Sequence, residues 1–97
     1  MTIIYKNNKI KKVCQNANIA QKEYNVDMAY LIHQRIDEIE SSDSIDTMIK
    51  HRIGNCHPLF FDRRNQYAVD LVQPYRLVFK QGEDFSAVRV LEIVNYH

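Results

Sequence analysis

Apolar residues in the first half of the chain recur at helical spacing. This spacing predicts a helix from about Asn8 to Tyr24, and a second helix begins after Asn25, whose side chain can cap it. The polar segment at 41–44 ends the second helix and offers caps for a short third helix over residues 45–52, with Gly54 suited to a left-handed position just beyond it. The expected buried faces are Ile10, Val13, Cys14, Ala17 and Ala20, then Met28, Ile32, Ile36 and Ile39, with Arg35, Glu38 and Glu40 facing water.

After Gly54 the pattern changes to runs rich in β-branched and aromatic residues, separated by turn signals. Short connections between these runs favour an antiparallel meander. Helices first and strands later indicate the α+β class, with N-terminal helices packed on one face of a small, mostly antiparallel β-sheet. The other face of such a sheet is left to bind a ligand. The strands are predicted over residues 2–5, 57–60, 66–72, 76–80 and 87–95.

Length and composition indicate one globular domain over residues 1–97. The chain has a mass of 11.5 kDa, and 45% of its residues are hydrophobic and 26% charged, which argues against disorder. Its apolar runs are too short to cross a membrane, and residues 1–6 lack the layout of a signal peptide, so we expect a cytoplasmic protein. Cys14 and Cys56 are then expected to be reduced thiols, and the spacing of Cys56 from His51 and His57 matches no common metal site.

Charge is unevenly distributed, although the formal net charge is only +1. Residues 1–22 hold five lysines and no acidic residue, residues 23–46 hold seven acidic residues and one arginine, and residues 50–80 hold six basic residues against two acidic ones. Basic surface beside a cleft can concentrate a phosphate-bearing ligand. Solvated helix faces carry the same kind of charge, so the pattern permits a nucleic-acid partner without requiring one.

Several side chains of the strand half could together carry out phosphoryl transfer on RNA. Histidine can exchange protons with a ribose 2′-hydroxyl or a leaving 5′-oxygen, and arginine can grip two phosphate oxygens. The sequence has no Gly-rich phosphate loop and no paired aspartates for a metal, so such a reaction would use no metal and no cofactor. These residues equally fit a strand end, a solvated turn and a chain terminus, so their chemistry alone indicates only a capacity to bind nucleic acid. They are His57, Arg63, Arg64, Arg76, Tyr96 and His97.

Five short motifs follow one another through this half of the chain. They are His57-Pro-Leu59, Asp62-Arg63-Arg64, Tyr67-Ala-Val-Asp-Leu71, Tyr75-Arg76-Leu-Val-Phe79 and Glu92-Ile-Val-Asn-Tyr96-His97. In order and spacing they resemble the HigB-like branch of the RelE/ParE toxin superfamily, also called the plasmid maintenance killer proteins. The resemblance covers about the last 40 residues, and the helical half matches in layout and length only. It implies a RelE-like fold.

The resemblance also implies an activity and partners. It implies the toxin of a type II toxin–antitoxin system, a ribosome-dependent mRNA endonuclease (mRNA interferase) that inhibits translation by acid–base cleavage through the 2′-hydroxyl, with no metal or cofactor. The implied partners are mRNA on the ribosome and a cognate helix-turn-helix antitoxin of the HigA-like kind, held in a hetero-oligomeric complex. No membrane is involved in this activity.

The roles of individual residues follow from the same resemblance. His57 and His97 would be the two proton-transfer groups, and Tyr96 would position or stack on a base of the RNA. Arg76 would hold the scissile phosphate, with Arg64 beside it. This assignment makes the strand half the catalytic half of the molecule.

Arg63 and Asn95 would complete the substrate-binding set. Asn95 stands where the family commonly has aspartate, and an amide cannot carry a proton at neutral pH. Two alternatives therefore stay open. One is a ParE-like toxin that poisons DNA gyrase by binding, and the other is a catalytically weak domain that binds RNA or a protein partner.

Overall fold

The computed structural model describes residues 1–95 and arranges them as helices followed by a sheet, with one strand ahead of the helices. The two shortest helices, labelled η, are of the 3-10 type. In chain order the elements are β1 (Thr2–Tyr5), α1 (Asn8–Gln15), α2 (Ala17–Glu23), α3 (Val26–Ser41), α4 (Ile45–Lys50), η1 (Ile53–Asn55), β2 (His57–Pro58), η2 (Phe61–Arg63), β3 (Gln66–Asp70), β4 (Tyr75–Gln81) and β5 (Ala87–Asn95).

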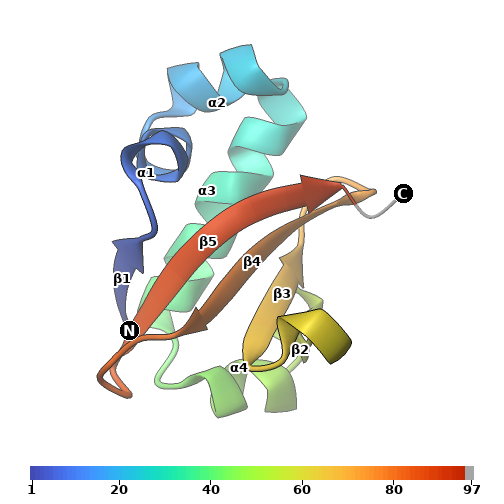
Figure 1. Cartoon of the computed structure of the whole chain (residues 1–97). Helices are drawn as coiled ribbons and strands as arrows, with labels where there is room; N and C mark the ends of the chain where they lie inside the picture. Colours follow the sequence, from blue (N-terminus) through green and yellow to red (C-terminus); the bar gives the residue numbers. More distant parts are fainter. Residues whose placement is uncertain (96–97) are drawn as a thin grey trace.

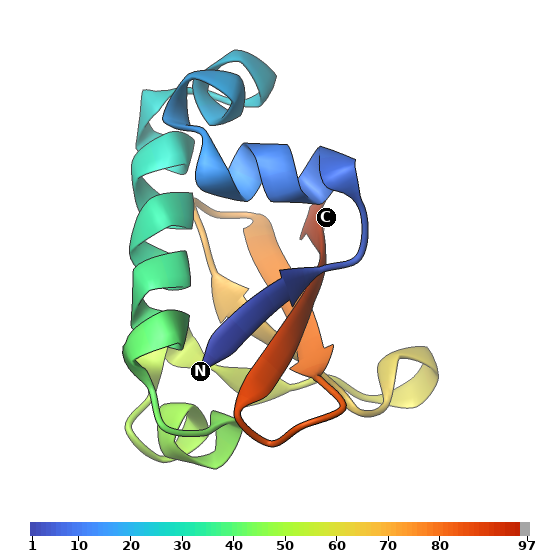
Figure 2. The same ribbon diagram turned by 90° about the vertical axis from the view of Figure 1, so that its left-hand side faces the viewer.

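The strands form one five-stranded sheet in the order β1-β5-β4-β3-β2. Strands β2 to β5 pair antiparallel with one another, as the meander predicted, whereas β1 pairs parallel to β5. Helices α1 and α3 cover one side of this sheet (Figures 1 and 2). The α+β class and the one-sided helical cover are therefore confirmed. Among the described residues, no helix is both long and apolar enough to span a membrane.

Asparagine and serine side chains start the helices by accepting hydrogen bonds from backbone N–H groups that no helical carbonyl can reach. The Asn25 Oδ1 accepts from the Met28 N–H at 2.8 Å, which confirms Asn25 as the cap of α3. The Ser44 Oγ accepts from the Thr47 N–H at 3.0 Å, so the serine-rich segment does cap α4. That helix ends at Lys50, two residues short of the predicted end.

The single helix predicted over residues 8–24 is wrong, because Asn16 divides it. Asn16 has an extended backbone that ends α1, and its Oδ1 accepts from the N–H groups of Asn18 and Ile19 to begin α2. The break also changes which residues face inward. Ala17 is exposed rather than buried, whereas Ile19 is half-buried and Ala20 fully buried.

The core lies between the helices and the covered face of the sheet. The predicted stripe of α3 is fully confirmed, since all four of its residues are buried. They pack in one cluster with sheet residues such as Leu77 and Phe79, which have no exposed surface. Each such side chain contributes about 1.5–3 kcal/mol of hydrophobic stabilisation. The stripe residues are Met28, Ile32, Ile36 and Ile39.

Arg35 does not face water as expected. Only 15% of its side chain is exposed, its Nε donates to the Asp70 carbonyl at 2.6 Å, and its Nη1 donates to the Glu38 carboxylate at 2.8 Å. Gly54 lies against it with a φ of +58°, and a Cβ there would come within 2.8 Å of the Arg35 Cδ. The predicted left-handed glycine is thus confirmed, and it also makes room for a half-buried arginine that ties α3 to β3.

The strands agree closely with the predicted segments, except at their ends. Strand β2 has only two residues, because the chain leaves the sheet at Leu59 after one further hydrogen bond, from the Leu59 N–H to the Gln66 carbonyl at 2.9 Å. Strand β3 ends at Asp70, and the turn that follows contains a cis peptide bond before Pro74. The register between β4 and β5 shifts at Val78 and Phe79.

Candidate functional site

The side of the sheet that faces away from α3, called the outer face here, carries three of the five candidate residues that the structure describes. Directly paired residues of neighbouring antiparallel strands share a face, and successive residues along a strand alternate between faces. The register therefore places three rows of side chains across the outer face. These rows are His57, Ala68, Val78 and Glu92; then Asp70, Arg76 and Val94; then Gln66, Lys80 and Arg89.

His57 begins β2 and is held by a hydrogen bond from its ring. The Nδ1 atom lies 2.7 Å from the carbonyl oxygen of Asn55. A carbonyl only accepts hydrogen bonds, so Nδ1 carries the proton, and in the neutral ring the free electron pair is on Nε2. This tautomer gives His57 a fixed orientation and a nitrogen able to accept a proton from a ligand.

Arg76 lies one row along the outer face, directly opposite Asp70 in the register. Its Nε is 3.3 Å from the Asp70 Oδ1, and the Asp70 Oδ2 accepts from the Asn55 Nδ2 at 3.0 Å. Both side chains are partly shielded from water. Asn55 therefore contacts both His57 and Asp70, and through Asp70 it supports the position of the Arg76 guanidinium.

Arg63 crosses the outer face from the loop between β2 and β3. Its Nη2 donates to the Glu92 Oε2 on β5 at 3.1 Å, and its Nη1 donates to the Gln66 Oε1 at 3.1 Å. Since β3 and β4 lie between β2 and β5 in the sheet, the pair of Arg63 and Glu92 links this loop to a strand that is not its neighbour. Arg64, the next residue, is exposed and forms no side-chain hydrogen bond or ion pair with the part of the chain that the structure describes.

The structure separates Asn95 from this group. Asn95 pairs with Tyr75, whose ring makes an edge-to-face contact with Tyr24 on the helical side of the sheet, with centroids 5.4 Å apart. The alternation along β5 thus places Asn95 on the face opposite Val94 and Arg76. Two further candidates, Tyr96 and His97, lie outside the described residues.

Three residues of the site were not singled out from the sequence. They are Asn55, Asp70 and Glu92, which bind His57, Arg76 and Arg63 respectively. Asp70 did carry a signal, because it is an acidic residue in a strand of otherwise uncharged residues. Asn55 carried none, since its left-handed backbone, with a φ of +56°, and its contacts depend on the folded loop.

Neither cysteine contributes a nucleophile. Cys56 lies between Asn55 and His57 in the chain but is buried, and burial raises the pKa of its thiol to about 12. Burial raises the pKa of Cys14 to about 12 as well, in agreement with its prediction as a core residue. Both thiols therefore stay protonated at neutral pH. Within residues 1–95, no three His, Cys, Asp or Glu side chains gather as metal ligands would.

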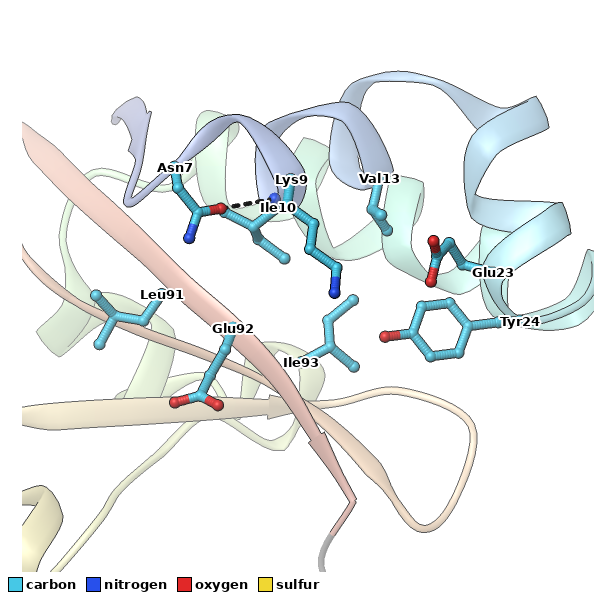
Figure 3. Close-up of a pocket in the computed structure, with 9 residues that line it drawn as sticks. All are labelled: Asn7, Lys9, Ile10, Val13, Glu23, Tyr24, Leu91, Glu92 and Ile93. Carbon is cyan, nitrogen blue, oxygen red and sulfur yellow. Dashed lines mark hydrogen bonds between the residues drawn. The ribbon is translucent and has the colours of Figure 1, made fainter.

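A hollow of about 270 Å³ lies on the other side of β5, between that strand, α1 and the end of α2. Figure 3 shows the Lys9 side chain extending from α1 toward Tyr24 and Ile93, whereas the Glu92 carboxylate turns away from it. None of the candidate residues that the structure describes lines this hollow. The candidate chemistry is therefore on the outer face.

The arrangement of the helices and the sheet is shared with a solved toxin of the RelE/ParE-like fold. The chain is similar to the solved structure of the YoeB/ParE toxin from Agrobacterium tumefaciens, with a TM-score of 0.60 over 100% of both chains and 11% identical residues. At this identity the likeness shows the fold, and it does not single out the HigB branch. No family model and no curated protein matches the sequence.

Proposed function

We propose that this chain is the toxin of a type II toxin–antitoxin system and that it cleaves mRNA on the ribosome without a metal or cofactor. The order of its sequence motifs and the RelE/ParE fold both support this function. The observation that carries it is the outer face, where an oriented imidazole and an arginine lie in adjacent rows of the sheet. This is the pairing of groups that cleavage of RNA through its own 2′-hydroxyl requires.

The proposed reaction starts when one imidazole removes the proton of the ribose 2′-hydroxyl. The 2′-oxygen then attacks the adjacent phosphorus, and the bond from phosphorus to the 5′-oxygen breaks. A second imidazole gives its proton to that leaving oxygen, so a 2′,3′-cyclic phosphate and a 5′-hydroxyl end are formed. His57, through Nε2, is one of these two groups, and His97 is assigned as the other from the family resemblance.

Positive charge would stabilise the extra negative charge on the phosphoryl oxygens in the transition state. Arg76 is proposed for this role, with Arg64 as a second phosphate ligand. Arg63 is already bound to Glu92 and Gln66. We therefore propose that it holds the loop in position as well as contacting the substrate. Tyr96 is proposed to stack on a base of the mRNA, as aromatic residues commonly do with unpaired RNA, and Asn95 is kept in the proposed substrate-binding set as a contact from the strand end.

The proposed partners follow from the function. A cognate helix-turn-helix antitoxin of the HigA-like kind would bind the toxin in a hetero-oligomeric complex, and the ribosome would present the mRNA. Both interactions are proposed to take place in the cytoplasm.

A second function has one specific observation in its favour. Both Arg63 and Arg76 face a carboxylate on the outer face, and such pairs are also found on surfaces that serve only in binding. A toxin that binds and poisons DNA gyrase would need no proton-transfer groups. Supercoiling by gyrase can be measured in vitro with the purified protein. Equal inhibition by wild type and by His57→Ala would favour this second function.

Growth arrest in a bacterial host tests the proposed residues. His57→Ala and Arg76→Ala should each relieve the arrest caused by the wild-type chain, and circular dichroism should show both variants folded. The conservative variant Arg76→Lys, which keeps a positive charge but loses the fork that binds two phosphate oxygens, should be intermediate. Full arrest by folded His57→Ala and Arg76→Ala would contradict the assignment.

A further inference from the structure

Two neighbouring phenylalanines in the loop between β2 and β3 are exposed to solvent. Phe60 is 70% exposed and Phe61 is 88% exposed. Phe61 also has a left-handed backbone, with a φ of +59°, which a bulky residue seldom adopts. Burial cannot explain either position, because neither ring enters the core.

The loop is fixed to the sheet on both sides of these rings. Before them, the Leu59 N–H binds the Gln66 carbonyl at 2.9 Å. After them, Arg63 is tied to Gln66 and to Glu92 on β5. Helix η2, drawn in yellow, projects on the side of the sheet away from α3 (Figure 2). The two aromatic side chains are thus carried by an anchored loop at the border of the outer face.

Basic side chains outnumber acidic ones around the loop, where Asp62 lies within η2. Arg64 follows η2 directly and is exposed, and the nearest row of the outer face, at the start of β3, adds Lys80 and Arg89. Neither Lys80 nor Arg89 takes part in an ion pair within the residues described, although Glu83 and Asp84 line the same hollow as both. Exposed aromatic rings beside unneutralised basic side chains are typical of surfaces that bind single-stranded nucleic acid.

The chemistry of the phenylalanine side chain also limits how these two residues could contact RNA. Its ring has no donor or acceptor, so it cannot distinguish bases by hydrogen bonds, but every base has a flat face on which it can stack. Resting on the function proposed above, we propose that Phe60 and Phe61 form a stacking platform for an unpaired base of the RNA. This subsite does not include the residues assigned to catalysis.

The absence of tryptophan from the chain allows a direct test. The variant Phe61→Trp contains a single indole, whose fluorescence should be quenched in a saturable way by a 12-nucleotide single-stranded RNA. Duplex RNA of the same length should quench it much less, because its bases are already stacked on one another. A Tyr30→Trp variant is the matched control, since Tyr30 is 72% exposed but lies on α3, and its fluorescence should not respond.

Affinity for the same RNA gives a second, independent readout. Phe61→Ala should weaken binding by about fivefold or more, and Tyr30→Ala should leave it within about twofold. Phe61→Leu keeps an apolar side chain without a flat ring, so it should bind as weakly as Phe61→Ala. RNA affinity retained by Phe61→Leu would show that binding does not depend on a flat ring, and would overturn the proposal.

Equal quenching by single-stranded and duplex RNA, or no quenching at saturating RNA, would also overturn it. These experiments are independent of catalysis, so the two proposals can fail separately. If the wild-type chain binds single-stranded RNA through Phe61 but cleaves no mRNA, the result supports the stacking platform and contradicts the proposed nuclease activity. If wild type and Phe61→Ala cleave mRNA equally and bind RNA with the same affinity, the result supports the nuclease activity and contradicts the stacking platform.

Discussion

The Asn55 side chain donates a hydrogen bond to the Asp70 carboxylate at 3.0 Å, and the Asn55 carbonyl accepts one from His57 at 2.7 Å. Because Asp70 also faces Arg76, one residue at the end of η1 supports both a proposed proton-transfer group and the proposed phosphate ligand. Asn55 touches no reacting atom in this scheme, so it is a positioning residue. Its contribution should appear in the rate of cleavage more than in the folding of the chain.

Asn55→Gly separates these two effects. Glycine accepts the left-handed φ of +56° and keeps the carbonyl that orients His57, so only the bond to Asp70 is lost. We expect kcat for mRNA cleavage to fall about tenfold with little change in KM, since a misplaced phosphate ligand acts mainly on the transition state. A change in KM alone, or wild-type activity, would show that Asn55 does not position Arg76.

Removal of the Phe79 ring should strongly destabilise the fold. Phe79 has no exposed surface and packs beside Tyr67 with ring centroids 6.0 Å apart. Phe79→Ala should lower the free energy of unfolding by about 3–5 kcal/mol, which urea denaturation would measure. The matched change Phe85→Ala, at a residue 86% exposed, should cost less than about 0.5 kcal/mol. Similar losses for both variants would contradict the described core.

The ion pair between Arg63 and Glu92 should add little to stability. Its side chains are 35% and 46% exposed, so solvent screens their attraction. A double-mutant cycle with Arg63→Ala and Glu92→Ala should give a coupling of about 0.2–1 kcal/mol in urea denaturation. A coupling well above 2 kcal/mol, roughly twice that upper bound, would mean that the pair is more deeply enclosed than described.

The buried thiols predict how stability depends on alkaline pH. Burial raises the pKa of Cys14 and Cys56 from the ordinary value of 9.0 to about 12 in the folded chain. Between these values the unfolded chain loses thiol protons that the folded chain keeps, so the free energy of unfolding should fall as pH rises above 9. Unfolding followed by circular dichroism from pH 7 to 11 measures this, and Cys14→Ala with Cys56→Ala should make the decline shallower. An identical decline in both proteins would contradict the thiol contribution.

Local rules explain why so much of the fold could be predicted from the sequence. Asn25 and Ser44 cap helices through contacts within three residues, and the strands after Gly54 follow from local pattern and turn residues. The break at Asn16 could not be predicted, because the apolar spacing continues across it. Arg35 could not be placed either, since its burial depends on the distant Gly54 and Asp70.

In the candidate site too, residues marked by local sequence motifs could be predicted, whereas contacts that depend on the folded sheet could not. His57 and Arg76 were singled out from the sequence, and the sheet register brings them to one face. Asn95 is placed on the opposite face by the alternation along β5, which a motif read without its register does not specify. The contact of Asn55 with Asp70 joins residues 15 positions apart and exists only once the sheet has formed.

Mapping of new RNA 5′ ends in a bacterial host, minutes after induction of the chain, tests the central claim most directly. Wild type should produce new ends inside translated codons, and these ends should disappear when translation initiation is blocked or when folded His57→Ala replaces wild type. Growth arrest by the wild-type chain with intact mRNA would contradict the claim that this protein is a ribosome-dependent mRNA endonuclease.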